Sequence, residues 1–242
     1  MQYYFDILNK CQSIQTFFSQ RKDGSMKLTT DPALKEMISS NRIRFFLENS
    51  INQKRVVSAE IVHGNKINKV VEDDGGKTIN NADGLITQDK NIFLSITSAD
   101  CLPIFLFEPE KEIIGMIHAG WRSLEKNIIQ NAAQKIKELG GKPENILAGI
   151  GPAICQKHYG VGSEIAEKFA GYPETIKNDG GKIYLNIKKI ALLQLLEWGV
   201  KKKNIEISPE CTFELPRQYF SARRDQKKEV EAMVSLIGIR NI

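Results

Sequence analysis

The chain has 242 residues, of which 41% are hydrophobic and 26% charged, a composition that is ordinary for a globular protein able to bury its own core. Its apolar runs, such as IFLSI, LPIFLF and IIGMI, are far shorter than the roughly 18 residues that indicate a membrane span, so we expect no membrane partner. The net charge of +5 is mild and no nucleic-acid motif is present; we therefore expect no nucleic-acid partner, while a positive surface suits an anionic small substrate.

The first half of the chain is predicted to contain one helix followed by a series of short strands. Residues 32–48 have a helical pattern, with Asp31 as the N-cap and Pro32 at the first helical position. The β-branched stretch 56–64 predicts a strand that ends at His63, just before a glycine. Further strands are expected in KVVEDDGGKT, which turns at its glycine pair, in NADGLIT, and near residues 92–97, 102–107 and 112–118.

The second half is predicted to alternate helices with short strands. Apolar residues recur with a helical period from Ser123 to Leu139, which predicts one helix that stops at the glycine pair after it. SEIAEKFAG predicts a second helix capped by Ser163, and IKKIALLQLLEWGV predicts an amphipathic helix that ends at Gly199. Strands are expected over residues 144–152, in KIYLN, in NIEISPECTF as it runs toward Cys211, and in the final MVSLIGI.

This order of elements lacks the regular strand–helix–strand rhythm of a doubly wound fold, and tight turns join several of the strands. It therefore favours an α+β fold with mixed or antiparallel sheets and flanking helices. The sequence has no Pro/Ser-rich linker, internal repeat or low-complexity block. We expect a single catalytic domain over residues 1–242, as a monomer or a homodimer.

The cysteines, at positions 11, 101, 155 and 211, are widely spaced and form no CxxC pair. The N-terminal segment MQYYFDILNK lacks the basic stretch, apolar core and small-residue cleavage site of a signal peptide. In a chain of this size, scattered cysteines are typical of reduced thiols. We therefore expect a cytoplasmic location.

Cys101 and His118 lie at the ends of two apolar, strand-like runs that a short turn joins. Pro103 prevents the chain from continuing as a helix, so the Cys101 thiol is expected at a turn between strands. Each residue taken alone is typical of a buried cysteine or a core histidine. Their placement at the ends of neighbouring strands, beside the start of a helix, indicates a shared site.

His63, Cys101 and His118 together have the chemistry of a metal site. Imidazole and thiolate are preferred ligands of zinc and copper, and three protein ligands leave a fourth position for water or substrate. The separation of these residues along the chain matches no metal motif by itself, so the metal site is one hypothesis among others. Cys101 and His118 also suit a metal-free cysteine hydrolase, with the thiol as nucleophile and the imidazole as base.

Several phrases resemble the laccase-domain family, also called the YfiH family; in chain order they are HGN, NADGLIT, TSADCLPIFL, GMIHAGWRSL, GIGPAICQKHYGVG, CTF and FSARRD. The resemblance covers about residues 56–237, and ADCLP and HAGWR are its most distinctive parts. It implies a YfiH-like fold and a metal-dependent purine nucleoside phosphorylase that acts on adenosine, inosine, guanosine and methylthioadenosine and also deaminates adenosine. The implied partners are a purine nucleoside and phosphate.

The resemblance places the family's metal ligands, which are also the expected catalytic residues, on His63, Cys101 and His118. Zinc is the expected cofactor, with copper as the alternative. An older label of the family, polyphenol oxidase, suggests copper-dependent phenol oxidation, for which Met116 would add a weak fourth ligand. A multicopper centre needs a further cluster held largely by histidines, and the chain has three histidines in total, so we exclude it.

Basic residues near these motifs are candidates for phosphate binding. Arg122 lies near the start of a helix next to His118, where its guanidinium and free backbone N–H groups would hold phosphate together. Arg223 and Arg224 form a second basic pair. The simpler interpretation of all of them is a surface or structural arginine.

Asp83 and Asp100 are candidates to orient a histidine or to hydrogen-bond a ribose, although Asp83 also suits a cap of the ADG turn. Cys155 and His158 have ligand chemistry, but they lie in a variable part of the family and are predicted to be structural or surface residues. A non-enzymatic binding protein is the remaining functional class, and it predicts no turnover of any nucleoside.

Overall fold

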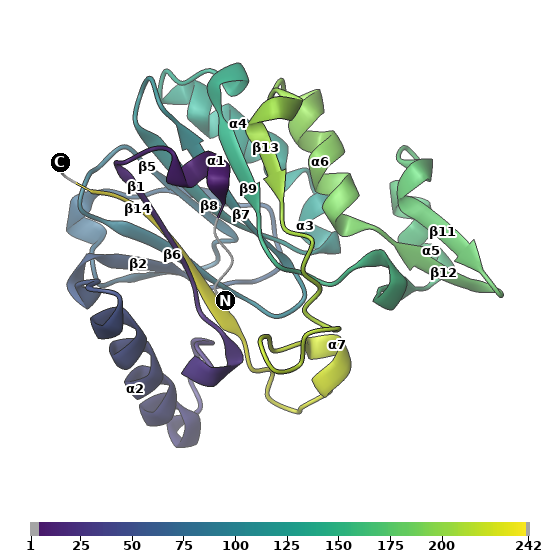
Figure 1. Ribbon diagram of the computed structural model, residues 1–242, viewed down its shortest axis with the longest axis horizontal. Helices are drawn as coiled ribbons and strands as arrows, with labels where there is room; N and C mark the ends of the chain where they lie inside the picture. Colours follow the sequence, from purple (N-terminus) through teal and green to yellow (C-terminus); the bar gives the residue numbers. More distant parts are fainter. Residues whose placement is uncertain (1–4, 241–242) are drawn as a thin grey trace.

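Two β-sheets packed face to face form the centre of the fold (Figure 1). Helix α2 (Pro32–Glu48) covers the outer face of one sheet, and helices α4 (Ile128–Glu138) and α6 (Ile187–Glu197) cover the outer face of the other. The structure is a computed structural model and describes residues 5–240. The expected domain limits at residues 1 and 242, and the first four residues of the N-terminal segment considered for a signal peptide, lie outside this range.

The larger sheet has six strands, and apolar side chains cover both of its faces. Its strands, in spatial order, are β13 (Ile205–Ile207), β9 (Leu147–Ile150), β7 (Leu102–Glu108), β8 (Ile113–Ala119), β5 (Gly84–Thr87) and β3 (Ile67–Lys69). The pairs from β9 to β5 are antiparallel, and β13 and β3 are added in parallel at the edges. Successive side chains of a strand point to opposite faces, so Ile104 packs toward the helices while Phe105 packs toward the second sheet.

The second sheet has five strands and shares a core with the first. Its spatial order is β1 (Ile14–Phe18), β14 (Met233–Ile239), β6 (Phe93–Ser98), β2 (Val56–Ala59) and β4 (Thr78–Ile79). Leu94 and Ile237 from this sheet pack in one cluster with Phe105 and Met116 of the first. On the outer face, Val234 and Leu236 pack against the aromatic side chains of α2.

The helix predicted from Ser123 to Leu139 is wrong as a single element. The structure has two helices there, α3 (Trp121–Glu125) and α4, separated at Asn127. Asn127 has a φ of 59°, in the left-handed region that ends a helical turn. The apolar period continues across the break because both helices bury the same side against the six-stranded sheet. The other two long helices, α2 and α6, are confirmed, including the N-cap hydrogen bond from Ala33 N to Asp31.

Several predicted strands are shorter in the structure. The strand expected over residues 144–152 is only β9, and the stretch KVVEDDGGKT contains the last residue of β3 and a 3-10 turn, Glu72–Asp74, before its glycine pair. The strand expected to end at His63 stops at Ala59, and residues 60–66 form a loop in which His63 has a φ of 58°. The strand expected to run toward Cys211 is only β13, and Cys211 forms an isolated bridge with Ala153. Strand β1 was not predicted.

A small three-stranded antiparallel sheet extends from one side of the molecule (Figure 1). It contains β10 (Gly160–Val161), β12 (Lys182–Leu185) and β11 (Ile176–Asp179). The helix predicted in SEIAEKFAG is a single α-turn, α5 (Ser163–Ala166), continued by a 3-10 turn, and its N-cap is Gly162 rather than Ser163. The remaining short helices are α1 (Asp6–Asn9) and α7 (Ala222–Asp225).

The expected fold class is confirmed. Parallel and antiparallel pairs occur in the same sheets, and the long helices flank the two large sheets instead of alternating regularly with their strands. Within residues 5–240, no helix combines the length and the apolar character needed to cross a membrane.

Candidate metal centre

Cys101 and His118 meet because β7 and β8 form an antiparallel pair. In this pair Leu102 lies opposite Ala119 and Pro103 lies opposite His118, so the start of β7 is next to the end of β8. Cys101 directly precedes β7, in a turn where Asp100 has a φ of 86°. The structure therefore confirms that the thiol lies at a turn between strands and that the two side chains come from the ends of neighbouring strands.

His63 reaches the same place from the loop that follows β2, and the carboxylate of Asp83 fixes that loop. Asp83 Oδ1 accepts a hydrogen bond from the backbone N–H of His63 at 2.8 Å, and Oδ2 accepts one from Gly64 at 2.7 Å. Asp83 is fully buried and directly precedes β5. A buried carboxylate bound to successive N–H groups accounts for the left-handed backbone at His63.

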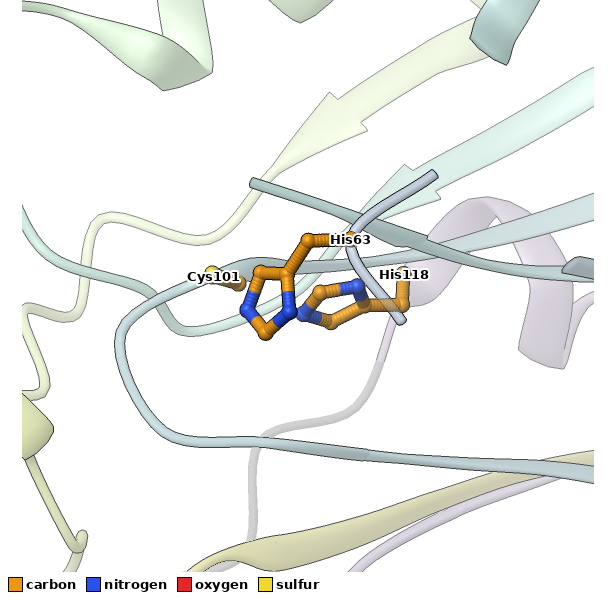
Figure 2. A group of neighbouring side chains, drawn as sticks. All are labelled: His63, Cys101 and His118. Carbon is orange, nitrogen blue, oxygen red and sulfur yellow. The ribbon is translucent and has the colours of Figure 1, made fainter. Parts of the chain in front are cut away.

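The same carboxylate orients His118. Its Oδ1 lies 3.1 Å from His118 Nδ1, which leaves Nε2 as the ring nitrogen available to the other two side chains. The imidazoles of His63 and His118 are perpendicular, at 89°, with ring centroids 4.9 Å apart. One nitrogen from each ring and the Cys101 Sγ all lie within 4.8 Å of one another (Figure 2). The prediction that these three residues converge is confirmed.

The charges of Cys101 and His118 depend on each other. Burial opposes ionisation of the Cys101 thiol, but the attraction of His118 and hydrogen bonds from both imidazoles outweigh burial and lower the pKa of the thiol to about 6. Burial likewise opposes protonation of His118, and the neighbouring Cys101 and Asp83 outweigh it and raise the pKa of the imidazole to about 9. Both shifts favour a thiolate, the form of cysteine that binds metals.

The donor set fits a zinc-class metal ion. Two imidazoles and one thiolate are borderline-soft ligands, and a histidine whose second nitrogen bonds a carboxylate is the usual arrangement at zinc sites. Gly120 adds a steric requirement, because a Cβ at this position would lie 2.8 Å from Cys101 Sγ and 3.6 Å from His63 Cδ2. The backbone thus leaves room for the three ligands only if residue 120 is glycine. The sequence prediction did not identify Gly120, although the glycine of HAGWR was its signal.

A pocket of about 630 Å³ opens above these ligands. Two arginine–aromatic pairs lie on its wall: Arg122 over the Trp121 ring at 4.4 Å, and Arg223 over the Tyr159 ring at 5.2 Å. The sequence prediction missed the two aromatic residues, for which the Trp of HAGWR and the Tyr of HYG were available signals. It also missed Lys27, which nothing in its neighbourhood indicated.

The predicted arginines have different roles in the structure. Arg122 is exposed and forms no ion pair with a carboxylate within residues 5–240. Because α3 has only five residues, the main contribution of this helix to the pocket is the Arg122 guanidinium and not its backbone N–H groups. Arg223 lines the pocket and donates from Nη1 to the carbonyl of Gly160 at 2.8 Å. Arg224 does not line it: its guanidinium donates to the carbonyls of Thr212, Phe213 and Tyr219 and to Asp225.

Asp100 ties the Cys101 turn to the C-terminal part of the chain. Its Oδ1 accepts from the Thr212 hydroxyl at 2.6 Å, and its Oδ2 accepts from the Ser221 hydroxyl at 3.0 Å and from the Arg223 backbone at 2.8 Å. Asp100 lines the pocket, but these internal donors occupy both carboxylate oxygens. Its observed contacts therefore position the Cys101 turn and the Arg223 segment.

Three other residues with ligand-type side chains lie outside this pocket: Met116, which the copper alternative offered as a weak ligand, and Cys155 and His158, which were predicted to be structural or surface residues. Met116 is fully buried in the core between the two sheets. Cys155 and His158 lie together with Glu214 in a separate group of donor atoms.

Comparisons with known proteins found a matching family and similar sequences and structures. The sequence profile of the family described as "Multi-copper polyphenol oxidoreductase laccase" matches residues 25–240. A curated relative, "Purine nucleoside phosphorylase YlmD" of Bacillus subtilis (strain 168), is 32% identical over 197 residues, which cover 76% of this chain and 70% of that protein. "Purine nucleoside phosphorylase RC0672" of Rickettsia conorii is 39% identical over 172 residues, which cover 67% of this chain and 68% of the relative.

Solved structures show the same fold. The crystal structure of YlmD from Geobacillus stearothermophilus superposes with a TM-score of 0.90 at 26% identity and covers 98% of this chain and 94% of its own. The crystal structure of the hypothetical protein YfiH from Bacillus licheniformis superposes with a TM-score of 0.86 at 26% identity, covering 95% and 94%. The resemblance found in the sequence motifs is thereby confirmed over almost the whole chain.

Proposed function

The chain belongs to the family described as multi-copper polyphenol oxidoreductase laccase, and from this premise we propose that it is a metal-dependent purine nucleoside phosphorylase. Its curated relatives carry that enzyme name. One observation carries the proposal: three side chains whose donor atoms are close enough to hold a metal ion lie in a pocket whose wall also holds two arginine–aromatic pairs. Cationic groups suit phosphate, and aromatic rings suit a purine base.

The proposed substrates are adenosine, inosine, guanosine and methylthioadenosine, each with inorganic phosphate. In phosphorolysis, a phosphate oxygen forms a bond to C1′ of the ribose while the bond from C1′ to the purine nitrogen breaks. Arg122 and Arg223 would hold the phosphate, since a guanidinium binds an oxyanion through parallel hydrogen bonds. Trp121 and Tyr159 would contact the purine. Ser98 also lines the pocket, and its buried hydroxyl has no hydrogen-bond partner within residues 5–240.

His63, Cys101 and His118 would hold the metal, which we propose to be zinc, with copper as the alternative. A zinc ion there would act as a Lewis acid that stabilises negative charge developing on the substrate. Asp83 would keep the His118 ring in its ligating orientation and the His63 loop in place, since it bonds both. Deamination of adenosine is proposed as a second activity of the same pocket.

A metal-free cysteine hydrolase is a second candidate, favoured by one specific observation. Cys101, His118 and Asp83 form a series in which the imidazole lies between a thiol of lowered pKa and a buried carboxylate. Nucleophile, base and orienting acid have this order in thiol hydrolases. A hydrolase of that kind needs no metal and uses His63 only to help lower the pKa of the thiol, so loss of His63 should weaken a hydrolase but abolish a metal enzyme.

The experiment is incubation of the purified protein with adenosine and phosphate, with chromatographic separation of the products. Adenine with ribose 1-phosphate supports phosphorolysis, and inosine supports deamination. If the protein contains stoichiometric metal and yet forms neither product, the proposal is contradicted. Oxidation of a phenol by the copper-loaded protein, without nucleoside turnover, would instead favour a copper-dependent polyphenol oxidase, the activity that the family description names.

Two variants complete the test. His63→Ala should abolish both metal content and nucleoside turnover if the protein is a metal enzyme, whereas a metal-free hydrolase would keep part of its activity, since Cys101 and His118 remain. Cys101→Ser is paired with Cys11→Ser, which removes a half-buried thiol outside the pocket and should leave turnover unchanged.

A further inference from the structure

A second group of ligand-type side chains lies outside the pocket. Cys155 is the N-cap of a 3-10 turn, Gln156–His158, and Glu214 arrives from a segment more than fifty residues later in the chain. A 3-10 helix has three residues per turn, so the side chains at positions 155 and 158 project on the same side. The Cys155 Sγ, a ring nitrogen of His158 and a carboxylate oxygen of Glu214 all lie within 4.8 Å of one another.

Neighbouring contacts hold these donors in place. The His158 ring stacks on Phe213, with centroids 4.3 Å apart and an interplanar angle of 15°. Its Nε2 lies 2.9 Å from Glu214 Oε1, so ring nitrogen and carboxylate already face each other. The Cys155 backbone N–H donates to Cys211 Sγ at 3.2 Å, which places a second sulfur beside the group. The arrangement thus depends on packing and backbone contacts as well as on the exposed ion pair.

We propose that Cys155, His158 and Glu214 form a second metal site, separate from the His63–Cys101–His118 centre, that binds a divalent cation of the zinc class. Sulfur, imidazole nitrogen and carboxylate oxygen are the three ligand types that zinc takes in proteins. Ligand atoms about 2.0–2.3 Å from a tetrahedral zinc lie roughly 3.5 Å apart, so small side-chain rotations bring this group together around an ion.

The charges around the site decide what competes with a cation. Lys157 Nζ lies 3.4 Å from the same Glu214 oxygen that faces His158, but its side chain is 77% exposed and free to move away. Lys188 donates its ammonium protons to the carbonyls of Ser208 and Glu210. Lys157 is the lysine that pairs with one of the three proposed ligands, so its removal should strengthen cation binding.

The site is connected through the chain to the wall of the first pocket. Tyr159 and Gly160 follow His158 in the chain; Tyr159 lines the pocket, and the Gly160 carbonyl accepts from Arg223. Thr212, two residues before Glu214, donates to Asp100. A cation bound by Cys155 and His158 would therefore fix the turn that carries Tyr159 into the pocket.

The test is a titration of Co²⁺ into the full-length, metal-free protein, because cobalt accepts zinc ligands and its thiolate charge-transfer absorption reports a bound cysteine. The titration is run at pH 8 under reducing conditions. Wild-type protein should bind two equivalents and Cys101→Ser one equivalent, still with thiolate absorption. Cys101→Ser/Cys155→Ser should lose that absorption. Glu214→Gln in the Cys101→Ser background should weaken binding by about tenfold or more, as altered metal-site partners do.

Lys157→Gln is a second test that misfolding cannot imitate. This exposed change should tighten cobalt binding to the Cys101→Ser protein, whereas a misfolded variant would lose binding. Cys101→Ser protein that binds no cobalt through a thiolate would overturn the proposal, as would binding unchanged by Cys155→Ser or by Lys157→Gln. A Cys155–Cys211 disulfide that persists under the reducing conditions of the titration would also overturn the proposal. Nucleoside turnover of the Cys155→Ser protein, measured separately, keeps failure of this site distinct from failure of the proposed enzyme activity.

Discussion

One carboxylate oxygen of Asp83 lies 3.1 Å from Nδ1 of His118, and both side chains are buried. The same carboxylate also binds the backbone of the loop that carries the other histidine of the centre. A single residue thus sets both the ring orientation of one proposed ligand and the backbone position of another. Metal binding should depend on it more than on any surface charge.

We predict that Asp83→Asn weakens zinc binding about 10- to 100-fold, the range found for residues that orient metal ligands. Asparagine retains the size of the side chain but replaces one acceptor oxygen with a donor that faces N–H groups. Competition with a chromogenic chelator measures the affinity. The control is Asp179→Asn, an exposed carboxylate on β11. Equal affinities of the two variants would show that Asp83 does not organise the centre.

Gly120→Ala should disturb the same centre from the opposite side. The added Cβ would lie 2.8 Å from Cys101 Sγ, and overpacking of this kind costs about 1–3 kcal/mol. We expect weaker metal binding and a proportional loss of turnover. Gly171→Ala is the matched control, because no atom lies within 4 Å of a Cβ there. Unchanged zinc affinity in Gly120→Ala would mean that the ligands rearrange freely.

The sequence predicted the fold best where one local pattern determines the structure. The apolar runs of β7 and β8 and the short turn between them specify a hairpin, and the hairpin alone brings Cys101 next to His118. The pattern failed where a distant group overrides it. Asp83 captures the backbone at His63 and Gly64, so a β-branched run that resembles a strand ends early as a loop.

The site was predictable only in part for the same reason. Nothing in local sequence shows that His63 lies beside Cys101. Residue chemistry offered the three side chains as one possible metal site, and the family resemblance added the assignment of each as a ligand. Asp100 was expected to bind substrate or orient a histidine, yet its observed partners are Thr212, Ser221 and Arg223, more than a hundred residues away. Tyr159 was missed because its position in the pocket follows from the fold of the 155–160 segment.

Arg122→Met and Arg223→Met should each raise the KM for phosphate by about tenfold or more, because a charge-assisted hydrogen bond contributes about 1.5–3 kcal/mol. This expectation rests on the proposed phosphorylase activity. Initial rates at varied phosphate and saturating nucleoside measure it. Arg217→Met, an exposed arginine outside the pocket, is the control. A change confined to the KM for the nucleoside would place these arginines near the base or ribose instead.

The final prediction concerns the wall of the pocket that Asp225 stabilises. Its carboxylate accepts from Arg224 Nε at 2.8 Å and from the Ser221 backbone at 3.1 Å, and it pairs with Arg21. Burial opposes its ionisation, but the arginines and these hydrogen bonds outweigh burial and lower the pKa of Asp225. A carboxyl with a lowered folded pKa stabilises the protein fully above its unfolded value of about 3.9 and loses that contribution as pH falls through the folded pKa.

We therefore expect Asp225→Asn to lower the free energy of unfolding by about 1.5–3 kcal/mol at pH 7, the scale of hydrogen bonds to charged groups. The difference from wild type should shrink as pH falls below about 4. Urea denaturation at a series of pH values between neutral and acidic measures it, with Asp6→Asn on α1 as an exposed control. A difference that stays constant down to the most acidic pH would assign the effect to lost packing, since only a charged Asp225 gives the predicted pH dependence.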